Sequence, residues 1–156
     1  MIAQTLQQQI AEAMKAKDSI RLSTLRMLSS AFNYEKIAKQ HDLSDEEETV
    51  VIRREAKKRQ DAIEALRQAQ GKHLNVQAES VEERIAKEEK ELEILKKYLP
   101  EELSDTELEK IIDKAIFSVS ASSIQDMGKV MGAANSEIKG RAEGRKVAEL
   151  VKAKLS

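Results

Sequence analysis

The sequence predicts an all-α protein, and three observations point to that fold class. Charged residues make up 35% of the 156 residues and aromatic residues only 3%, while Leu, Ile, Val, Ala and Met raise the hydrophobic share to 40%. This composition is typical of long amphipathic helices. β-branched runs bounded by turn signals, which would indicate strands, are missing. The chain also has a single proline, Pro100, so few positions interrupt a helix.

Two helices are predicted in the first forty residues, over 2–16 and about 19–39. Asp18 and Ser19 are plausible caps for the second of them. Each range carries one apolar stripe at steps of three and four. The stripes consist of Ile2, Leu6, Ile10, Ala13 and Met14, and of Leu22, Leu25, Leu28 and Phe32 with Met27 and Tyr34 beside them.

Capping boxes mark the starts of a third and a fourth helix. Ser44 is followed three residues later by Glu47, and Ser80 in the same way by Glu83. The third helix is expected to run to about Gln70 and stop at Gly71, with a polar connection over 72–79, and Pro100 is expected to end the fourth. The residues predicted to face inward are Val51, Ile52, Ile63, Leu66, Ile85, Leu92, Leu95 and Leu99. Those predicted to face water are Arg53, Arg54, Lys57, Lys58, Arg59, Glu88, Glu89, Glu91 and Glu93.

A domain boundary is predicted at Pro100 to Leu103, which divides the chain into residues 1–99 and 100–156. The second part holds three predicted helices. The first follows a capping box at Ser104 to Glu107 and carries Leu108, Ile111, Ile112, Ala115 and Ile116. The other two span about 124–138, capped by Ser122 or Ser123, and about 144–155. The predicted architecture is therefore an N-terminal four-helix domain followed by a small three-helix domain.

Four of the five glycines fall close together, at positions 128, 132, 140 and 144. A glycine inside a helix costs about 1 kcal/mol relative to alanine, so something is expected to offset that cost. Gly128 and Gly132 lie four residues apart and share one helix face. We therefore expect them to let a neighbouring helix approach closely, and we expect Gly140 to stop the helix before it.

Charge is strongly patterned although the formal net charge is only −1. Residues 53–72 carry seven basic and three acidic side chains, residues 79–109 five basic and twelve acidic, and residues 123–156 seven basic and four acidic. These blocks could pair with one another across helix faces or present separate surfaces to partners. The sequence leaves both interpretations open.

Several classes of site and location are not expected. The chain has no cysteine, which excludes disulfides and thiolate zinc sites. His41 and His73 are isolated in predicted linkers, and neither H-x-E nor H-E-x-x-H occurs, so we expect no metal site and no cofactor. No apolar run reaches the roughly 18 residues that a membrane span needs, and the N-terminus lacks the pattern of a secretory signal, so a cytoplasmic protein is predicted.

We find no credible active site in the sequence. A P-loop needs two glycines five residues apart after a strand, but these glycines are four apart and no strand is predicted. G-x-S-x-G, which would mark a nucleophile elbow, is also missing. The many carboxylates fall on amphipathic helix faces, where solvation accounts for them.

A basic corner is the strongest candidate for a binding site. Cations and glycines gather where one predicted helix ends and the next begins, at Lys139, Gly140, Arg141, Gly144, Arg145 and Lys146. Lys129, Lys152 and Lys154 are secondary candidates on the adjoining helices. A helix N-terminus beside basic side chains suits a phosphate group. Glu143 within the cluster and the lack of a nearby stacking aromatic favour the alternative, an ordinary solvated surface.

Several stretches together carry a resemblance to a known family. They are Arg21 to Ala31 with Asn33 and Glu35, Lys57 to Asp61, Leu92 to Ser104, Ala121 to Ser123, Asp126 to Gly132, and Lys139 to Gly144. In combination they make the chain similar to the YqeY family of small bacterial proteins over nearly its whole length.

The resemblance implies two all-helical domains, the second similar to the tail of GatB, a subunit of glutamine-dependent aminoacyl-tRNA amidotransferase. In that enzyme the tail helps to hold tRNA while other domains carry the chemistry. The implied partners are tRNA or a tRNA-handling protein, and the only activity implied by association is that of a carbon–nitrogen ligase with glutamine as amido donor. Two alternatives stay open: a protein–protein adaptor working through the acidic fourth helix or the basic third, and an accessory to amidation.

Overall fold

The structure, a computed structural model, describes residues 1–70 and 80–156 of the chain. Within these ranges it is built from helices and contains no strand, which confirms the predicted all-α class. The helices are α1 (Ile2–Lys15), α2 (Ser19–Lys39), α3 (Asp45–Gln70), α4 (Val81–Lys96), α5 (Asp105–Ser118), the 3-10 helix η1 (Ile124–Asp126), α6 (Met127–Ile138) and α7 (Gly144–Leu155). The predicted stop at Gly71, the polar connection over 72–79 and His73 lie outside the described residues.

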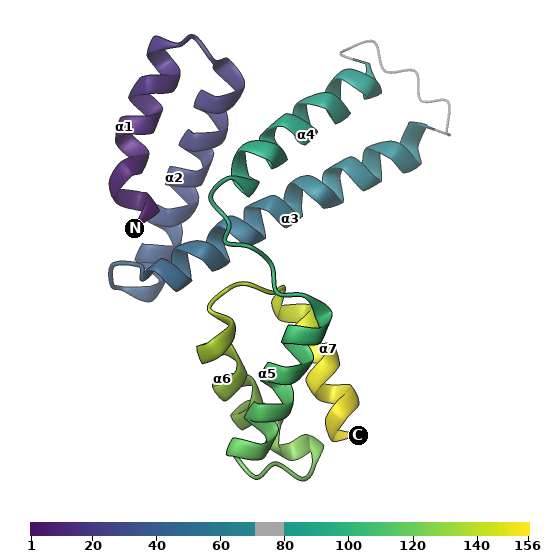
Figure 1. Ribbon diagram of the computed structural model, residues 1–156. Coiled ribbons are helices and arrows are strands. Elements are labelled where there is room, and N and C mark those ends of the chain that lie inside the picture. The colour runs from purple at the N-terminus through teal and green to yellow at the C-terminus, as the bar shows by residue number, and fades with distance from the viewer. Residues whose placement is uncertain (71–79) are drawn as a thin grey trace. The chain divides into compact units, whose positions relative to one another are not determined.

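The chain divides into two compact units, Met1–Leu99 and Pro100–Ser156. The first contains α1 to α4 and the second α5 to α7 (Figure 1). That the two units are domains able to fold separately stays a prediction.

The predicted capping boxes form at the starts of α3, α4 and α5. At α3, the Glu47 N–H donates to Ser44 Oγ over 3.2 Å and the Ser44 N–H donates to Glu47 Oε2 over 2.9 Å. Ser80 with Glu83 and Ser104 with Glu107 repeat this arrangement. Each box gives acceptors to N–H groups that have no partner within the helix.

In the N-terminal unit, α1 and α2 form an antiparallel hairpin, and α3 and α4 lie side by side (Figure 1). Their core consists of Leu6, Ala13, Leu25, Leu28, Phe32, Leu43, Val51, Ile52, Ala56 and Leu95. Glu48 of α3 is fully buried and accepts the backbone N–H groups of Ile2 and Ala3, at 2.6 and 3.2 Å. A side chain of α3 thereby caps the start of α1.

Four predictions for this unit were wrong in detail. Arg59 and Glu91, both expected to face water, are buried with exposed fractions of 9% and 5%. They face each other, with Arg59 Nε 2.7 Å from Glu91 Oε2. Met14, expected in the apolar stripe of the first helix, is exposed. α4 ends at Lys96 rather than at Pro100, because the N–H groups of the next turn bond three residues back instead of four.

The opposite charges of α3 and α4 pair across their contact. Besides Arg59 and Glu91, Arg67 Nη2 lies 2.8 Å from Glu89 Oε1. Of the two interpretations of the charge blocks, docking of charge against opposite charge therefore holds for these residues of the basic and the acidic block.

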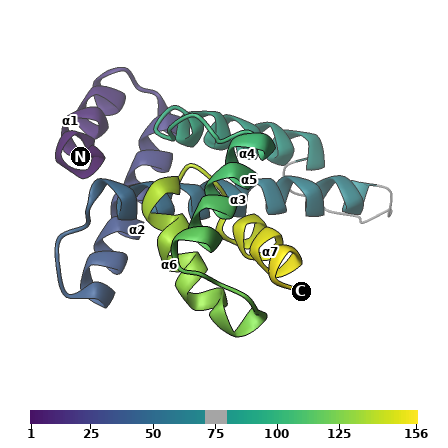
Figure 2. The same ribbon diagram turned by 60° about the horizontal axis from the view of Figure 1, so that its bottom comes forward.

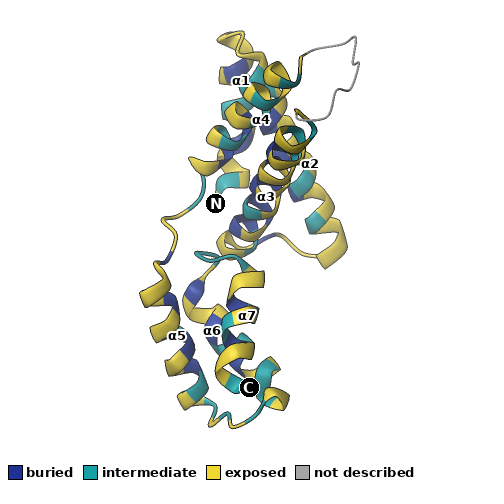
Figure 3. Ribbon diagram, turned by 90° about the vertical axis from the view of Figure 1, so that its right-hand side faces the viewer, coloured by how far each residue is buried: buried dark blue, intermediate teal, exposed yellow. Residues whose placement is uncertain are grey.

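The C-terminal unit packs α5, α6 and α7 against one another (Figures 1 and 2). Buried positions alternate with exposed ones along each helix (Figure 3). Its core consists of Leu103, Leu108, Ile112, Ala115, Val130, Ala134, Ile138, Val147 and Val151. The predicted sixth helix, 124–138, is confirmed except that its first turn is the 3-10 helix η1.

The predicted packing role of Gly128 and Gly132 is wrong. Both are exposed, and a Cβ added at either would meet no atom within 4 Å. The apolar face of α6 that contacts its neighbours is formed instead by Val130, Ala134 and Ile138. The lower helix propensity of these two glycines is therefore not offset by close packing of a neighbouring helix.

Candidate nucleic-acid interface

The corner between α6 and α7 is shaped by two consecutive left-handed residues. Lys139 has φ 50° and its N–H donates to the Asn135 carbonyl over 3.1 Å, and Gly140 follows with φ 73°. Glycine adopts this conformation without steric cost, whereas lysine does so only with strain. The prediction that the helix stops here is confirmed, and the turn leaves the Lys139 side chain exposed.

Arg141 ties this corner to the segment before α5. Its N–H donates to the Ile138 carbonyl over 2.9 Å, and its carbonyl accepts from the Leu103 N–H over 3.0 Å. Its Nε donates to the Glu101 carbonyl, also over 3.0 Å. With side chain and backbone both engaged, Arg141 has a structural role whether or not it meets a ligand.

The first turn of α7 presents Arg145 and Lys146. Glu143 is the N-cap of this helix, and its side chain makes no capping hydrogen bond. Arg145 Nε bonds Glu149 Oε1 over 3.1 Å, and the Arg145 side chain is 80% exposed. Lys146 Nζ bonds Asp105 Oδ1 at the start of α5, and this hydrogen bond raises the pKa of Lys146 above its ordinary value.

These ion pairs leave the cations available to a ligand. Both lie at the surface, where such a pair contributes about 0–1 kcal/mol. A phosphate that replaced Glu149 or Asp105 would therefore displace a weak interaction. The Lys146 ammonium is charged at neutral pH with or without Asp105, because the ordinary pKa of lysine already lies far above 7.

The predicted site residues do not all meet. Lys139, Gly140, Arg141, Gly144, Arg145 and Lys146 belong to one corner, as predicted from their spacing. Lys129 lies in the first turn of α6, roughly 15 Å along the helix axis from Lys139 at 1.5 Å per residue. Lys152 and Lys154 lie in the last turn of α7, and Lys154 Nζ is 2.7 Å from Asp113 Oδ1.

Sequence reasoning missed the acidic partners of the corner. The spacing of Arg145 and Glu149, four apart on a helix, was a usable signal. No sequence signal pairs Lys146 with Asp105, since these residues are 41 positions apart.

Two further findings concern the described residues alone. They contain no group of three or more histidine or carboxylate side chains placed to hold a metal ion. None of their helices combines the length and the hydropathy that a transmembrane span requires.

Comparison with known protein families identifies the family of this chain. The sequence matches the YqeY family, whose members are described as Yqey-like proteins, over residues 3–155. No curated protein matches the sequence significantly. Because the family match extends over nearly the whole chain, the protein belongs to the YqeY family.

Proposed function

We propose that this protein is a non-catalytic helical module that binds tRNA through the corner between α6 and α7. The observation that carries the proposal is the first turn of α7, where the side chain of the N-cap residue makes no capping hydrogen bond and where Arg145 and Lys146 follow the left-handed turn at Lys139 and Gly140. Free N–H groups and cations at a helix N-terminus attract phosphate, and glycine lets a sugar–phosphate backbone come close.

The likeness of the C-terminal part to the GatB tail supports tRNA as the RNA concerned. It rests on the family resemblance rather than on the geometry of the corner. Fold kinship alone is a weak warrant for function, so direct binding is the deciding measurement.

The test is a gel-shift titration of the full chain with unmodified tRNA at several salt concentrations. Lys139→Asn with Arg145→Gln is the informative variant, because asparagine tolerates the left-handed turn and neither side chain holds the fold together. Arg141 is left intact because its bonds to Glu101 and Leu103 are structural. The variant should bind tRNA more weakly. The slope of the logarithm of its binding constant against the logarithm of the salt concentration should become less steep by roughly one for each phosphate contact that is lost.

Lys110→Gln with Lys114→Gln is the matched control. It removes the same charge from exposed positions of α5 in the same unit. The control should bind tRNA as the unaltered protein does. Equal losses in both double variants, or no binding by the unaltered protein at 50 mM salt, would contradict the proposed site.

A further inference from the structure

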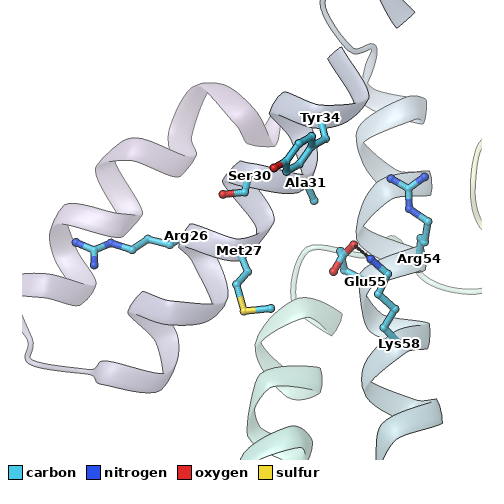
Figure 4. Close-up of a pocket in the computed structure, with 8 residues that line it drawn as sticks. All are labelled: Arg26, Met27, Ser30, Ala31, Tyr34, Arg54, Glu55 and Lys58. Carbon is cyan, nitrogen blue, oxygen red and sulfur yellow. Dashed lines mark hydrogen bonds and ion pairs between the residues drawn. The ribbon is translucent and has the colours of Figure 1, made fainter. Parts of the chain in front are cut away.

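A shallow groove runs between α2 and α3 of the N-terminal unit (Figure 4). It has a volume of about 470 Å³. Its lining residues are Arg26, Met27, Ser30, Ala31 and Tyr34 of α2 with Arg54, Glu55 and Lys58 of α3.

On its α2 side this groove is lined by part of an apolar stripe, which the rest of the unit covers incompletely: Ala31 packs against the core and Arg59 Nη2 donates to the sulfur of Met27 over 3.5 Å. Met27, Ala31, Tyr34 and Ala38 follow one another at steps of four, three and four, so they share one face of α2. Met27 and Tyr34 are 45% and 75% exposed, and Ile37, beside the stripe, is 73% exposed. From Met27 to Ala38 the stripe extends roughly 16 Å along the helix, the length of about three helical turns.

Cations stand on both sides of the stripe. Arg54 and Lys58 project from α3 along one side, while Arg26 extends away from α3 on the other (Figure 4). Arg26 Nη2 lies 3.7 Å from the sulfur of Met14, and the guanidinium has no carboxylate partner among the described residues.

The other two cations are paired with carboxylates of the unit. Arg54 lies 2.9 Å from Glu35, and both of these side chains reach the surface, so this pair exchanges partners at little cost. Lys58 lies 2.6 Å from Glu55, whose carboxylate is buried, so this pair is expected to stay intact. A ligand that brings its own carboxylates therefore finds two cations to bind, Arg26 and Arg54.

This combination fits one class of partner. An amphipathic helix buries apolar side chains spaced i, i+3, i+4 and i+7 in such a groove, and acidic residues on its flanks would meet the cations on either side. Single-stranded RNA fits less well, since Tyr34 is the only aromatic in the lining and Met27 offers a base no stacking surface. We propose that the groove between α2 and α3 binds an acidic, amphipathic helical segment of a partner protein.

The proposal is independent of tRNA binding, because it concerns the other unit. Its test uses the ¹⁵N-labelled full chain and a synthetic 14-residue helical peptide with leucines on one face and glutamates on both flanks. Two control peptides replace the glutamates by lysines or scramble the order. The glutamate peptide should shift the amide signals of α2 and α3 saturably, and the controls should leave them in place.

A double variant makes the assignment specific. Arg26→Glu with Tyr34→Ser changes only exposed side chains and should weaken peptide binding at least tenfold, while its tRNA gel shift stays unchanged. Lys114→Glu with Phe117→Ser, an exposed cation and an 87% exposed aromatic in the other unit, is the matched control and should bind as the unaltered protein does.

Several outcomes would overturn the proposal. They are shifts confined to other helices, equal shifts from the lysine peptide, and unchanged affinity in the groove variant. Displacement of the glutamate peptide by a single-stranded RNA oligonucleotide would assign the groove to nucleic acid instead.

Discussion

Arg59 and Glu91 form an ion pair that is almost fully removed from water. Arg59 Nε is 2.7 Å from Glu91 Oε2 and 3.6 Å from Glu88 Oε2, so one guanidinium faces two carboxylates. Burying a charge is costly unless a partner compensates it. Substitution of either residue should therefore lower the free energy of unfolding far more than substitution of a residue in an exposed pair.

Arg59→Ala should lower the free energy of unfolding by about 3–5 kcal/mol, because it leaves the Glu91 carboxylate buried without a cation. Arg59→Met combined with Glu91→Leu should restore most of that loss, since an apolar pair needs no compensation. Urea denaturation followed by circular dichroism measures both.

Arg54→Ala is the control for that series. The Arg54 side chain is half exposed and its partner Glu35 also has Lys39 Nζ at 4.0 Å, so the loss of Arg54 should cost about 0–1 kcal/mol. A cost of Arg59→Ala no larger than that of Arg54→Ala would show that the buried pair contributes little.

Glu47 gives the start of α3 a defined pH dependence. The hydrogen bond from Lys39, followed by the Ser44 N–H, lowers the pKa of Glu47 from its ordinary 4.5 to about 2. A lowered pKa in the folded state means that the stabilisation is complete above the unfolded value and is lost as pH falls toward the folded value. Glu47→Gln should therefore reduce the melting temperature above about pH 4.5, and the difference from the unaltered protein should shrink toward pH 2.

Glu46→Gln removes the same charge from the same helical turn without touching Ser44 or Lys39, and so serves as the comparison for the Glu47 variant. A difference between Glu47→Gln and the unaltered protein that stays constant from pH 6 to pH 2 would contradict the assigned cause.

Arg59 and Glu91 occupy inward positions of their helices that their charge makes hard to recognise in the sequence. Arg59 continues the inward series Ile52, Ala56 and Ile63 at steps of four, three and four, so periodicity alone placed it inside. A guanidinium is usually exposed, so residue type alone predicts the outside for Arg59. Glu91 was missed in the same way, although it stands four residues before buried Leu95.

At the level of elements, helix starts were predictable because their signals are local. A serine and a glutamate three residues apart fix the first turn whatever the helix packs against. The end of α4 was not predictable from Pro100, since a proline excludes helix at the residue before it but does not extend the helix to that point. The predicted close contact of α6 at Gly128 and Gly132 was also wrong. The spacing of the two glycines shows that they lie on the same face of the helix, but it does not show whether another helix packs against that face.

Gly132→Ala should stabilise the protein by about 1 kcal/mol, since the added methyl meets no atom and alanine favours the helix. Gly140→Ala should have the opposite sign, because φ of 73° is strained for any residue with a Cβ. The melting temperatures of the two variants compare the same substitution, glycine to alanine, in a helical and in a left-handed backbone conformation. Equal destabilisation by both would mean that Gly132 is in contact with something after all.

At the scale of the whole chain, the two units have separate cores, one formed by α1 to α4 and the other by α5 to α7. Residues 100–156 expressed alone should therefore be helical and unfold cooperatively, although a core of this size is marginal. Circular dichroism during heating tests this. A fragment that is unstructured while the full chain is folded would show that the two units depend on each other.

The fold class could be predicted from composition and periodicity, because both depend on the division of each single helix into an apolar face and a solvent-exposed face. Binding surfaces could be predicted only in part. The corner from Lys139 to Lys146 is contiguous in sequence, so its charge was visible. The groove between α2 and α3 joins residues up to 32 positions apart, and only the packed structure brings Arg26 and Lys58 to the same surface.

The ion pair between α3 and α4 also selects the alignment of these two helices. A slide of α4 by one turn, about 5.4 Å, would in one direction place Leu95 where Glu91 now faces Arg59, and would leave a buried guanidinium against a hydrocarbon surface. In the other direction Lys87 would arrive there together with Glu88, so that an ammonium group would lie beside the guanidinium. The native alignment is the one that gives Arg59 two carboxylates, Glu88 and Glu91, so two helices that are long and poor in aromatic residues can still settle into a single arrangement.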